Sequence, residues 1–224
     1  MTKDLECQRC GTCCRSGGPA LHHEDIELVQ SGKIPLKDLY TIRKGEMARD
    51  NVQGTLQPVT AELIKIKGVG RTWTCCYYDP ESKGCTIYED RPLECRVLNC
   101  RDTAAIEAIY DQQRLTRKDL LDAVPNLWDL VEEHEKKCSY RVLAELAARL
   151  KKGSDQDTVD NLVEMVGYDL HLRELITEKG RPDPALLDFL FGRPLTDTLP
   201  GFGIQAQKKG GRLNFKNFSL KLIT

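Results

Sequence analysis

The run Cys7-Gln8-Arg9-Cys10-Gly11-Thr12-Cys13-Cys14 decides how the first half of this chain is interpreted. Four cysteines fall within eight residues, and polar or turn-forming residues separate them. A hydrophobic core cannot use side chains at this density, because the adjacent Cys13 and Cys14 must point in different directions. A metal ion or cluster can, since two-residue gaps let the backbone loop around it and present several sulfurs. The run therefore predicts a metal centre.

A second group of cysteines follows, so that the first 100 residues hold nine of the ten in the chain. This group consists of Cys75, Cys76, Cys85, Cys95 and Cys100. In a reducing compartment, clustered cysteines are more often ligands or catalysts than disulfides. A disulfide scaffold is the alternative interpretation if the protein is exported.

Length, charge and hydropathy limit the classes of partner. With 224 residues the chain is long enough to bury a core without relying on metal alone. A net charge of −1 and a pI near 6.4 give no electrostatic case for nucleic acid or an anionic membrane. No apolar run is long enough to span a bilayer, and residues 1–6 are too polar for a secretory signal. We therefore predict a cytoplasmic protein without a nucleic-acid or membrane partner.

Beyond Cys100 the composition becomes helical and poor in thiols. From Asn126 to Lys152 apolar residues recur at three- and four-residue steps, which predicts one long amphipathic helix. Cys138 and His134 lie on its apolar stripe. We expect Cys138 to be a core thiol and His134 a hydrogen-bonded buried histidine rather than ligands.

The remaining elements are assigned from turn and capping signals. We expect helices from His23 to about Gly32, from Leu36 to about Arg49, over 104–113, from a cap at 154–157 to about Glu178, and over 183–191. We expect strands at 63–66 and 73–78, which would form a hairpin that delivers Cys75 to the metal, and a loop over 51–60. The tail from Gly201 onward alternates in a way that indicates an edge strand or a docked arm.

These elements predict an α+β, mainly helical fold. Residues 1–101 would be a cysteine-rich metal- or cluster-binding N-terminal module. Residues 102–224 would be a helical region with a C-terminal tail, on which the module packs to make one compact unit.

The second cysteine group is specific in its context, which reads Cys75-Cys-Tyr-Tyr-Asp79 and then Cys85-Thr-Ile-Tyr88-Glu-Asp-Arg91-Pro92-Leu-Glu-Cys95-Arg96. Together with the opening run, these segments resemble the YkgJ-like CxxCxxCC family, described as zinc- or iron-chelating proteins, over roughly residues 5–101. The resemblance gives ligand candidacy to Cys7, Cys10, Cys13, Cys14, Cys75, Cys85 and Cys95, with Cys100 as a further candidate. Cys76 falls where the family usually places another residue type, so we leave it out.

Thiolate ligands suit either zinc or an iron–sulfur cluster. Structural zinc usually uses two C-x-x-C knuckles, often with histidine. A compressed cysteine run is common where one loop binds a cubane-type [4Fe–4S] cluster. The flagellin lysine N-methylases share this cysteine pattern and are associated with an iron–sulfur cluster, so the resemblance also favours iron. We expect a [4Fe–4S] cluster, with zinc as the alternative. Eight candidate thiols exceed the four ligands of one centre. Either two centres are bound, or some thiols surround the centre without binding the metal directly or are redox-active.

Two arginines and two histidines lie near the cysteines in sequence. Arg91 and Arg96 flank Cys95 and are candidate cofactor-binding residues, because guanidinium groups would stabilise a negatively charged cluster. The alternative is that Arg91 shapes a turn while Arg96 is solvated. We expect His22 and His23 on a loop or helix start rather than as ligands.

The sequence therefore predicts a metal-binding protein, most simply one that uses a [4Fe–4S] cluster for redox or group-transfer chemistry. S-adenosylmethionine is a candidate methyl donor by family analogy only. A zinc-stapled binding module without catalysis, which recognises a protein partner, is one alternative, and a metal-handling protein is another. The sequence leaves open whether the protein is an enzyme.

Overall fold

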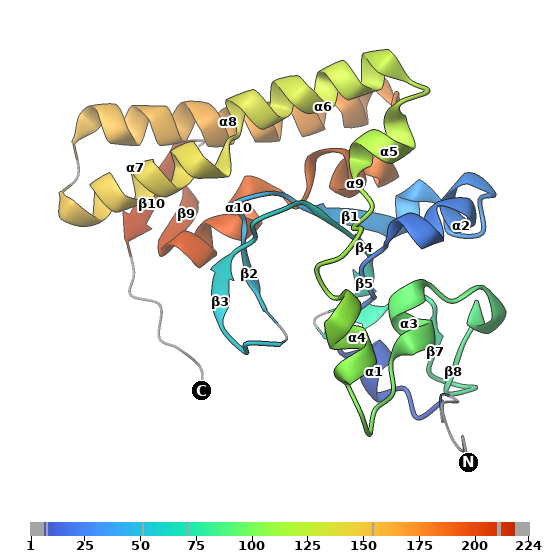
Figure 1. The fold of residues 1–224 in the computed structure, drawn as a ribbon. Coiled ribbons are helices and arrows are strands. Elements are labelled where there is room, and N and C mark those ends of the chain that lie inside the picture. Colours follow the sequence, from blue (N-terminus) through green and yellow to red (C-terminus); the bar gives the residue numbers. More distant parts are fainter. Residues whose placement is uncertain are drawn as a thin grey trace. The chain divides into compact units, whose positions relative to one another are not determined.

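The computed structural model describes residues 7, 9–50, 52–70, 72–153, 155–209 and 212–217. The chain divides into two compact units. Unit 1 contains the described residues of 1–41 and 63–120, and unit 2 contains those of 42–62 and 121–224. Helices predominate in the chain and the sheets are small and two-stranded (Figure 1), which confirms the α+β, mainly helical class. The boundary at residue 101 stays a prediction.

Unit 1 is built from short elements. They are α1 (Thr12–Arg15), η1 (His23–Asp25), α2 (Ile26–Gln30), η2 (Leu36–Asp38), β1 (Leu39–Ile42), β4 (Leu63–Ile66), β5 (Gly68–Val69), β6 (Thr74–Cys75), β7 (Tyr78–Asp79), β8 (Gly84–Cys85), η3 (Tyr88–Asp90), α3 (Leu93–Val97), α4 (Ala104–Ile109) and α5 (Arg117–Leu121). Strand β1 pairs with β4, β5 with β6, and β7 with β8. The fully buried apolar side chains of this unit include Leu21, Ile34, Leu39, Ile64 and Leu115.

The predicted helix from Leu36 to Arg49 is wrong. The segment forms a 3₁₀ turn and then strand β1, whose four residues are all buried. Leu39-Tyr40-Thr41-Ile42 combines aromatic and β-branched side chains in a continuous buried run, which favours a strand over an amphipathic helix. Gly45 then adopts φ 86°, a conformation that ends any regular element.

The predicted hairpin is displaced by a few residues. Leu63–Ile66 is a strand, as predicted, but it pairs with β1, and the run 73–78 is divided between β6 and β7. Cys75 is held instead by the β5–β6 pair, opposite Gly68. A Cβ atom on Gly68 would lie 2.4 Å from the Trp73 carbonyl oxygen, so the two short strands approach closely only because this residue is glycine.

Unit 2 contains the longer helices. Its elements are β2 (Met47–Arg49), β3 (Leu56–Pro58), α6 (Pro125–Lys137), α7 (Tyr140–Lys152), α8 (Gln156–Lys179), η4 (Pro184–Leu186), α9 (Leu187–Phe191), α10 (Leu195–Thr198), η5 (Leu199–Phe202), β9 (Ile204–Lys209) and β10 (Arg212–Asn217). Helices α6 and α7 both lie beside α8 (Figure 1). Strand β2 pairs with β3, and β9 pairs with β10. Strand β3 lies within residues 51–60, where the sequence predicted a loop.

The single helix predicted from Asn126 to Lys152 is divided into α6 and α7. The break lies at Cys138 (φ −113°, ψ 37°) and Ser139, which is extended. Serine is compatible with a helix start, but the Ser139 side chain makes no capping hydrogen bond, so it is only a weak local signal for the break. The apolar stripe crosses the break, because Val131 before it and Leu146 after it are both buried.

Two terminal signals in this half are confirmed. The Asp155 carboxylate accepts a hydrogen bond from the Thr158 backbone N–H at 2.7 Å, and Gly180 ends α8 in the left-handed conformation. The tail contains the antiparallel β9–β10 hairpin, with Gln207 opposite Asn214. The predicted tail positions Phe218, Leu220 and Leu222 lie outside the described residues.

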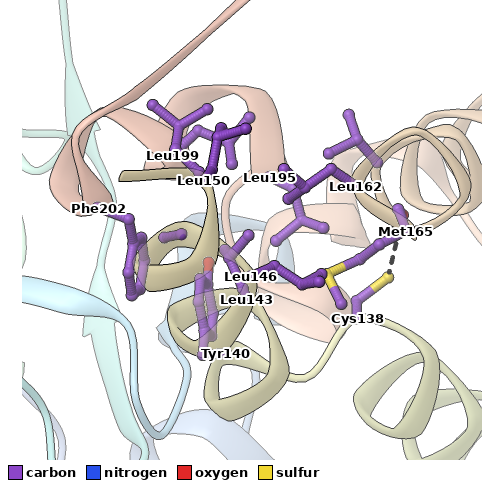
Figure 2. Close-up of a cluster of buried hydrophobic side chains, with 13 residues drawn as sticks. Cys138, Tyr140, Leu143, Leu146, Leu150, Leu162, Met165, Leu195, Leu199 and Phe202 are labelled. Carbon is purple, nitrogen blue, oxygen red and sulfur yellow. Dashed lines mark hydrogen bonds between the residues drawn. The ribbon is translucent and has the colours of Figure 1, made fainter. Parts of the chain in front are cut away.

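The core of unit 2 is apolar and includes one thiol. Figure 2 shows this cluster, which consists of Cys138, Tyr140, Leu143, Leu146, Ala147, Leu150, Leu162, Met165, Val166, Leu195, Leu199, Phe202 and Ile204. Cys138 is fully buried, and its Sγ lies 3.8 Å from the Met165 carbonyl oxygen (Figure 2). The prediction that Cys138 is a core residue is confirmed. None of the described helices combines the length and apolar character that crossing a bilayer requires.

Candidate metal centre

A glycine shapes the loop that carries the first cysteines. Cys7 and Cys10 precede α1, whereas Cys13 and Cys14 lie on it. Gly11 caps this helix with φ 72°, and a Cβ atom there would lie 2.5 Å from the Tyr78 hydroxyl oxygen. Only glycine combines this backbone conformation with so close an approach, so it lets the cysteine loop fold against the tyrosine.

Short hairpins and helices of unit 1 carry the second group. Cys85 ends strand β8 opposite Tyr78, Cys95 lies on α3, and Cys100 follows that helix. The turn before Cys85 forms as predicted, because the Asp79 carboxylate accepts hydrogen bonds from the backbone N–H groups of Glu81 (3.0 Å) and Ser82 (3.2 Å). The site therefore combines several elements, each too short to form alone.

These elements enclose a cavity of about 130 Å³. Seven of the eight predicted ligands line it, namely Cys7, Cys10, Cys13, Cys14, Cys85, Cys95 and Cys100. The eighth, Cys75, is buried and is not a lining residue, yet its charge raises the pKa of both Cys14 and Cys95. The two cysteine groups, which are far apart in sequence, thus meet at one place.

Burial favours the neutral form of four of the thiols that line the cavity. Burial raises the pKa of Cys13, Cys85 and Cys95, and it raises that of Cys14 to about 12. Cys95 is at the centre of the group, because the charges of four other cysteines raise its pKa further; these are Cys75, Cys13, Cys14 and Cys85. A thiol in these surroundings ionises readily only when a cation takes the place of its proton, so metal binding would release protons.

Cys76 affects the site through a hydrogen bond with the neighbouring Cys75. The hydrogen bond between the two side chains lowers the pKa of Cys75 to about 7 and raises that of Cys76. The positive charge of Lys65 also lowers the pKa of Cys75. Ionisation of Cys75 is therefore favoured by its surroundings, a property that the spacing of the cysteines does not reveal.

Only one of the two predicted arginines lines the cavity. Arg91 does, and its Nε donates a 2.7 Å hydrogen bond to the Tyr88 carbonyl oxygen. The guanidinium of Arg96 instead donates a 2.5 Å hydrogen bond to Glu24, outside the cavity lining. Three further cations, missed at the sequence level, also line the cavity: Arg9, Lys83 and Arg101. Each is within two residues of a predicted ligand, which is the signal that could have found them.

The two histidines near the opening run are engaged elsewhere. His22 is buried, with Nδ1 2.8 Å from the Gln112 carbonyl oxygen. The Nε2 atom of His23 lies 3.8 Å from the Asp119 carboxylate. Neither histidine is a lining residue of the cavity.

A buried polar network fixes helix α3, which carries Cys95. The Asp25 carboxylate accepts hydrogen bonds from the Leu93 N–H at 2.8 Å and the His22 N–H at 3.0 Å. The Glu94 carboxylate accepts a 2.7 Å hydrogen bond from the Ala20 N–H. Because Leu93 and Glu94 directly precede Cys95, these bonds set the position of that thiol.

Replacing Glu94 with glutamine is expected to lower the free energy of unfolding by about 2 kcal/mol and to speed metal loss. Burial alone would raise the pKa of Glu94, but His22, Lys65 and Arg114 together lower it, so the folded protein holds a charged carboxylate. A neutral amide would leave the Arg114 guanidinium, now 3.4 Å from Glu94 Oε1, without its counter-charge. Urea unfolding and the rate of metal transfer to a chelator measure the two effects.

Glu24→Gln is the matched control. The Glu24 side chain is 61% exposed and pairs with Arg96 at the surface, so its loss is expected to change stability by less than about 0.5 kcal/mol. Equal effects of the two substitutions would show that the network around Glu94 does not position Cys95.

A second group of ligand-type side chains occurs in unit 2. Potential ligand atoms of His134, Cys138 and Asp169 lie within 4.8 Å of one another. The Asp169 carboxylate already accepts hydrogen bonds from His134 Nε2 at 2.8 Å, Arg173 Nε at 2.9 Å and the Leu195 N–H at 2.9 Å. Both of its oxygens already accept hydrogen bonds and the Arg173 guanidinium lies beside it, so the group is a structural network. The prediction of a hydrogen-bonded buried His134 is confirmed.

Comparison with known protein families finds a match to one family model. Residues 6–110 match the family model CxxCxxCC, described as a "Putative zinc- or iron-chelating domain". No curated protein and no solved structure shows a significant match to the chain. The family description agrees with a cavity lined by seven thiols, and it supports zinc or iron as the metal. Residues 6–110 of this chain are therefore similar to the CxxCxxCC family of metal-chelating domains.

Proposed function

We propose that the cysteine-lined cavity of unit 1 holds a [4Fe–4S] cluster that serves redox or group-transfer chemistry. The observation that carries this proposal is the meeting of two separate cysteine groups around one cavity, with Cys95 at their centre. The described lining residues include cysteines but no histidine, aspartate or glutamate, and soft thiolate donors are the donor set that such a cluster takes.

The spacing of the sulfurs favours a cluster over a single zinc ion. Four thiolates bound to one zinc at its usual bond length lie about 3.8 Å apart. Among the described residues of unit 1, no three side chains form a group close enough to bind one metal ion. A cubane places an iron corner under each thiolate and so needs more widely spaced donors around a larger space.

The chain supplies what such a centre needs from its surroundings. Burial raises the pKa of Cys85 and the charge of Arg91 offsets part of that rise; the same charge would offset the negative charge of a thiolate-bound cluster. Tyr78 and Tyr88 line the same cavity and would limit the access of water. When bound, the cluster would supply electron transfer or an iron site for a substrate, while these residues hold it and shield it. Free thiols in this number also favour a reducing compartment, so we propose a cytoplasmic location.

Anaerobic purification followed by an absorption spectrum tests the proposal, with iron, sulfide and zinc assayed on the same sample. A brown protein with a broad band near ~400 nm and equal amounts of iron and sulfide is the expected result. A colourless protein with stoichiometric zinc would overturn it and favour a zinc-stapled module that recognises a partner.

Metal transfer is a second candidate function, favoured by the exposed thiols. Cys10 and Cys100 are exposed although they line the cavity, and a hydrogen bond with Thr12 lowers the pKa of Cys10. Such thiols can pass an ion to another carrier by ligand exchange. Exchange of bound metal with a chelator within seconds would favour transfer, whereas a half-life of hours would favour a resident cofactor.

A further inference from the structure

We propose that the cavity also binds a small anionic ligand, through its carboxylate or phosphate oxygens, at a cationic rim next to the metal centre. The inference rests on the proposed function, because it places this ligand beside the bound metal. It adds a substrate class that neither the cysteine pattern nor the family description contains.

The basic and acidic side chains among the described lining residues of the cavity are all of one sign. Four cations line it, namely Arg9, Lys83, Arg91 and Arg101, and the described lining residues include no aspartate or glutamate. Within the part of the chain that the structure describes, none of the four forms an ion pair, whereas Arg96 nearby is paired with Glu24. Unpaired cations gathered around a hollow create a positive potential that attracts anions.

Two of these cations are held in place by one aromatic ring. The guanidinium carbon of Arg91 lies 3.6 Å from the Tyr88 ring centroid, and that of Arg9 lies 4.0 Å from it. Two guanidinium groups can approach one ring this closely only from opposite faces. Stacking fixes both planes and leaves their edges as donors, and like charges on both sides of a ring favour an anion that bridges or neutralises them.

Hydrogen bonding orients Arg91 further. Its Nε is used by the Tyr88 carbonyl oxygen at 2.7 Å, while its terminal nitrogens form no other hydrogen bond within the described residues. A planar pair of N–H donors matches two oxygens of a carboxylate or a phosphate, and such charge-assisted pairs are the strongest hydrogen bonds of proteins. Asn99, also in the lining, adds a neutral polar group that can fix the orientation of a ligand.

Balance of the cluster's charge is the competing role for these cations. That role needs positive charge near the sulfurs, and Arg91 meets this condition because it lowers the pKa of Cys85. Arg9, Lys83 and Arg101 are exposed lining residues, so they are open to solvent at the mouth of the cavity. Exposed cations at a mouth are placed to meet an incoming ligand.

The test uses the metal-loaded full chain and calorimetric titration with succinate and, separately, inorganic phosphate. Succinamide, which has the same shape without charge, is the ligand control. At least one of the two anions is expected to bind, and the tighter one identifies the class. Arg91→Gln and Arg9→Gln are each expected to weaken binding roughly tenfold. Arg96→Gln, an arginine outside the cavity lining, is expected to leave affinity unchanged.

The outcomes separate this inference from the proposed function. A protein with full metal content that binds neither anion, or binds succinamide equally well, would overturn the anion site and leave the metal centre standing. Arginine variants that shift the reduction potential of the centre without any anion binding would assign these cations to charge balance alone. A wild-type protein without metal would instead refute the proposed function.

Discussion

Replacing Cys95 with serine is expected to reduce the metal content of the purified protein by roughly 100-fold or more. Cys95 is the thiol around which both cysteine groups meet, since four other cysteines raise its pKa. A serine hydroxyl is a poor ligand for soft metals, so the neighbouring thiols would form a site that lacks one ligand. The melting temperature is also expected to fall, because metal binding contributes folding free energy.

Metal analysis and thermal unfolding of the same preparations measure both effects. Cys138→Ala is the matched control, because Cys138 is a fully buried thiol in the core of unit 2. It is expected to keep its full metal content while losing about 1 kcal/mol of stability. Full metal content in Cys95→Ser would remove this residue from the ligand set, and metal loss in Cys138→Ala would contradict its assignment to the core.

Replacing Asp169 with alanine is expected to destabilise the protein by about 3–5 kcal/mol without loss of metal. Asp169 is fully buried and accepts hydrogen bonds from His134, Arg173 and the Leu195 N–H. Its removal leaves the buried Arg173 guanidinium with only the partly exposed Asp188 carboxylate, 3.9 Å away, as a counter-charge. Chemical unfolding measures the loss, and Asp160→Ala, an exposed position on the same helix, is expected to cost less than about 0.5 kcal/mol.

The same network predicts that stability falls at acidic pH. Burial alone would raise the pKa of Asp169, but His134 and Arg173 together lower it, so its contribution is present above the unfolded value of about 3.9 and is lost below it. Burial lowers the pKa of His134, so its contribution is lost as pH falls below the unfolded value of about 6.5. The melting temperature is therefore expected to drop from pH 7 toward pH 3. An Asp169→Ala variant whose pH profile runs parallel to that of the wild type would contradict this account.

The sequence was most informative where local residue types decide the structure. The cap at Asp155, the turn at Asp79 and the helix that ends at Gly180 follow from short-range hydrogen bonds and backbone preferences, and all three occur. The spacing of the cysteines identified candidates that line one cavity. It could not predict that Arg91 lines this cavity while Arg96 pairs with Glu24, because that depends on how α3 is oriented.

Long-range contacts account for most of what the sequence did not reveal. Glu94 and Asp25 look like ordinary surface acids in sequence, yet both are buried because groups far away in the chain complete their hydrogen bonds. Residues 39–42 read as part of a helix until their pairing with residues 63–66 is known. The division of residues 126–152 at Ser139 depends on the packing of two helices against α8 rather than on any strong local signal.

The membership of residues 42–62 in unit 2 has a consequence for synthesis on the ribosome. Arg43 and Glu46 emerge early, whereas their partners Glu135 and Arg193 are translated much later. Both early residues are fully buried in the folded chain, so nascent chains must keep two charged groups in water until helices α6 to α10 have been synthesised. A fragment that stops at residue 110, where the family match ends, would lack the partners of both charged residues. Expression of the whole chain is therefore the sound route to a stable metal centre.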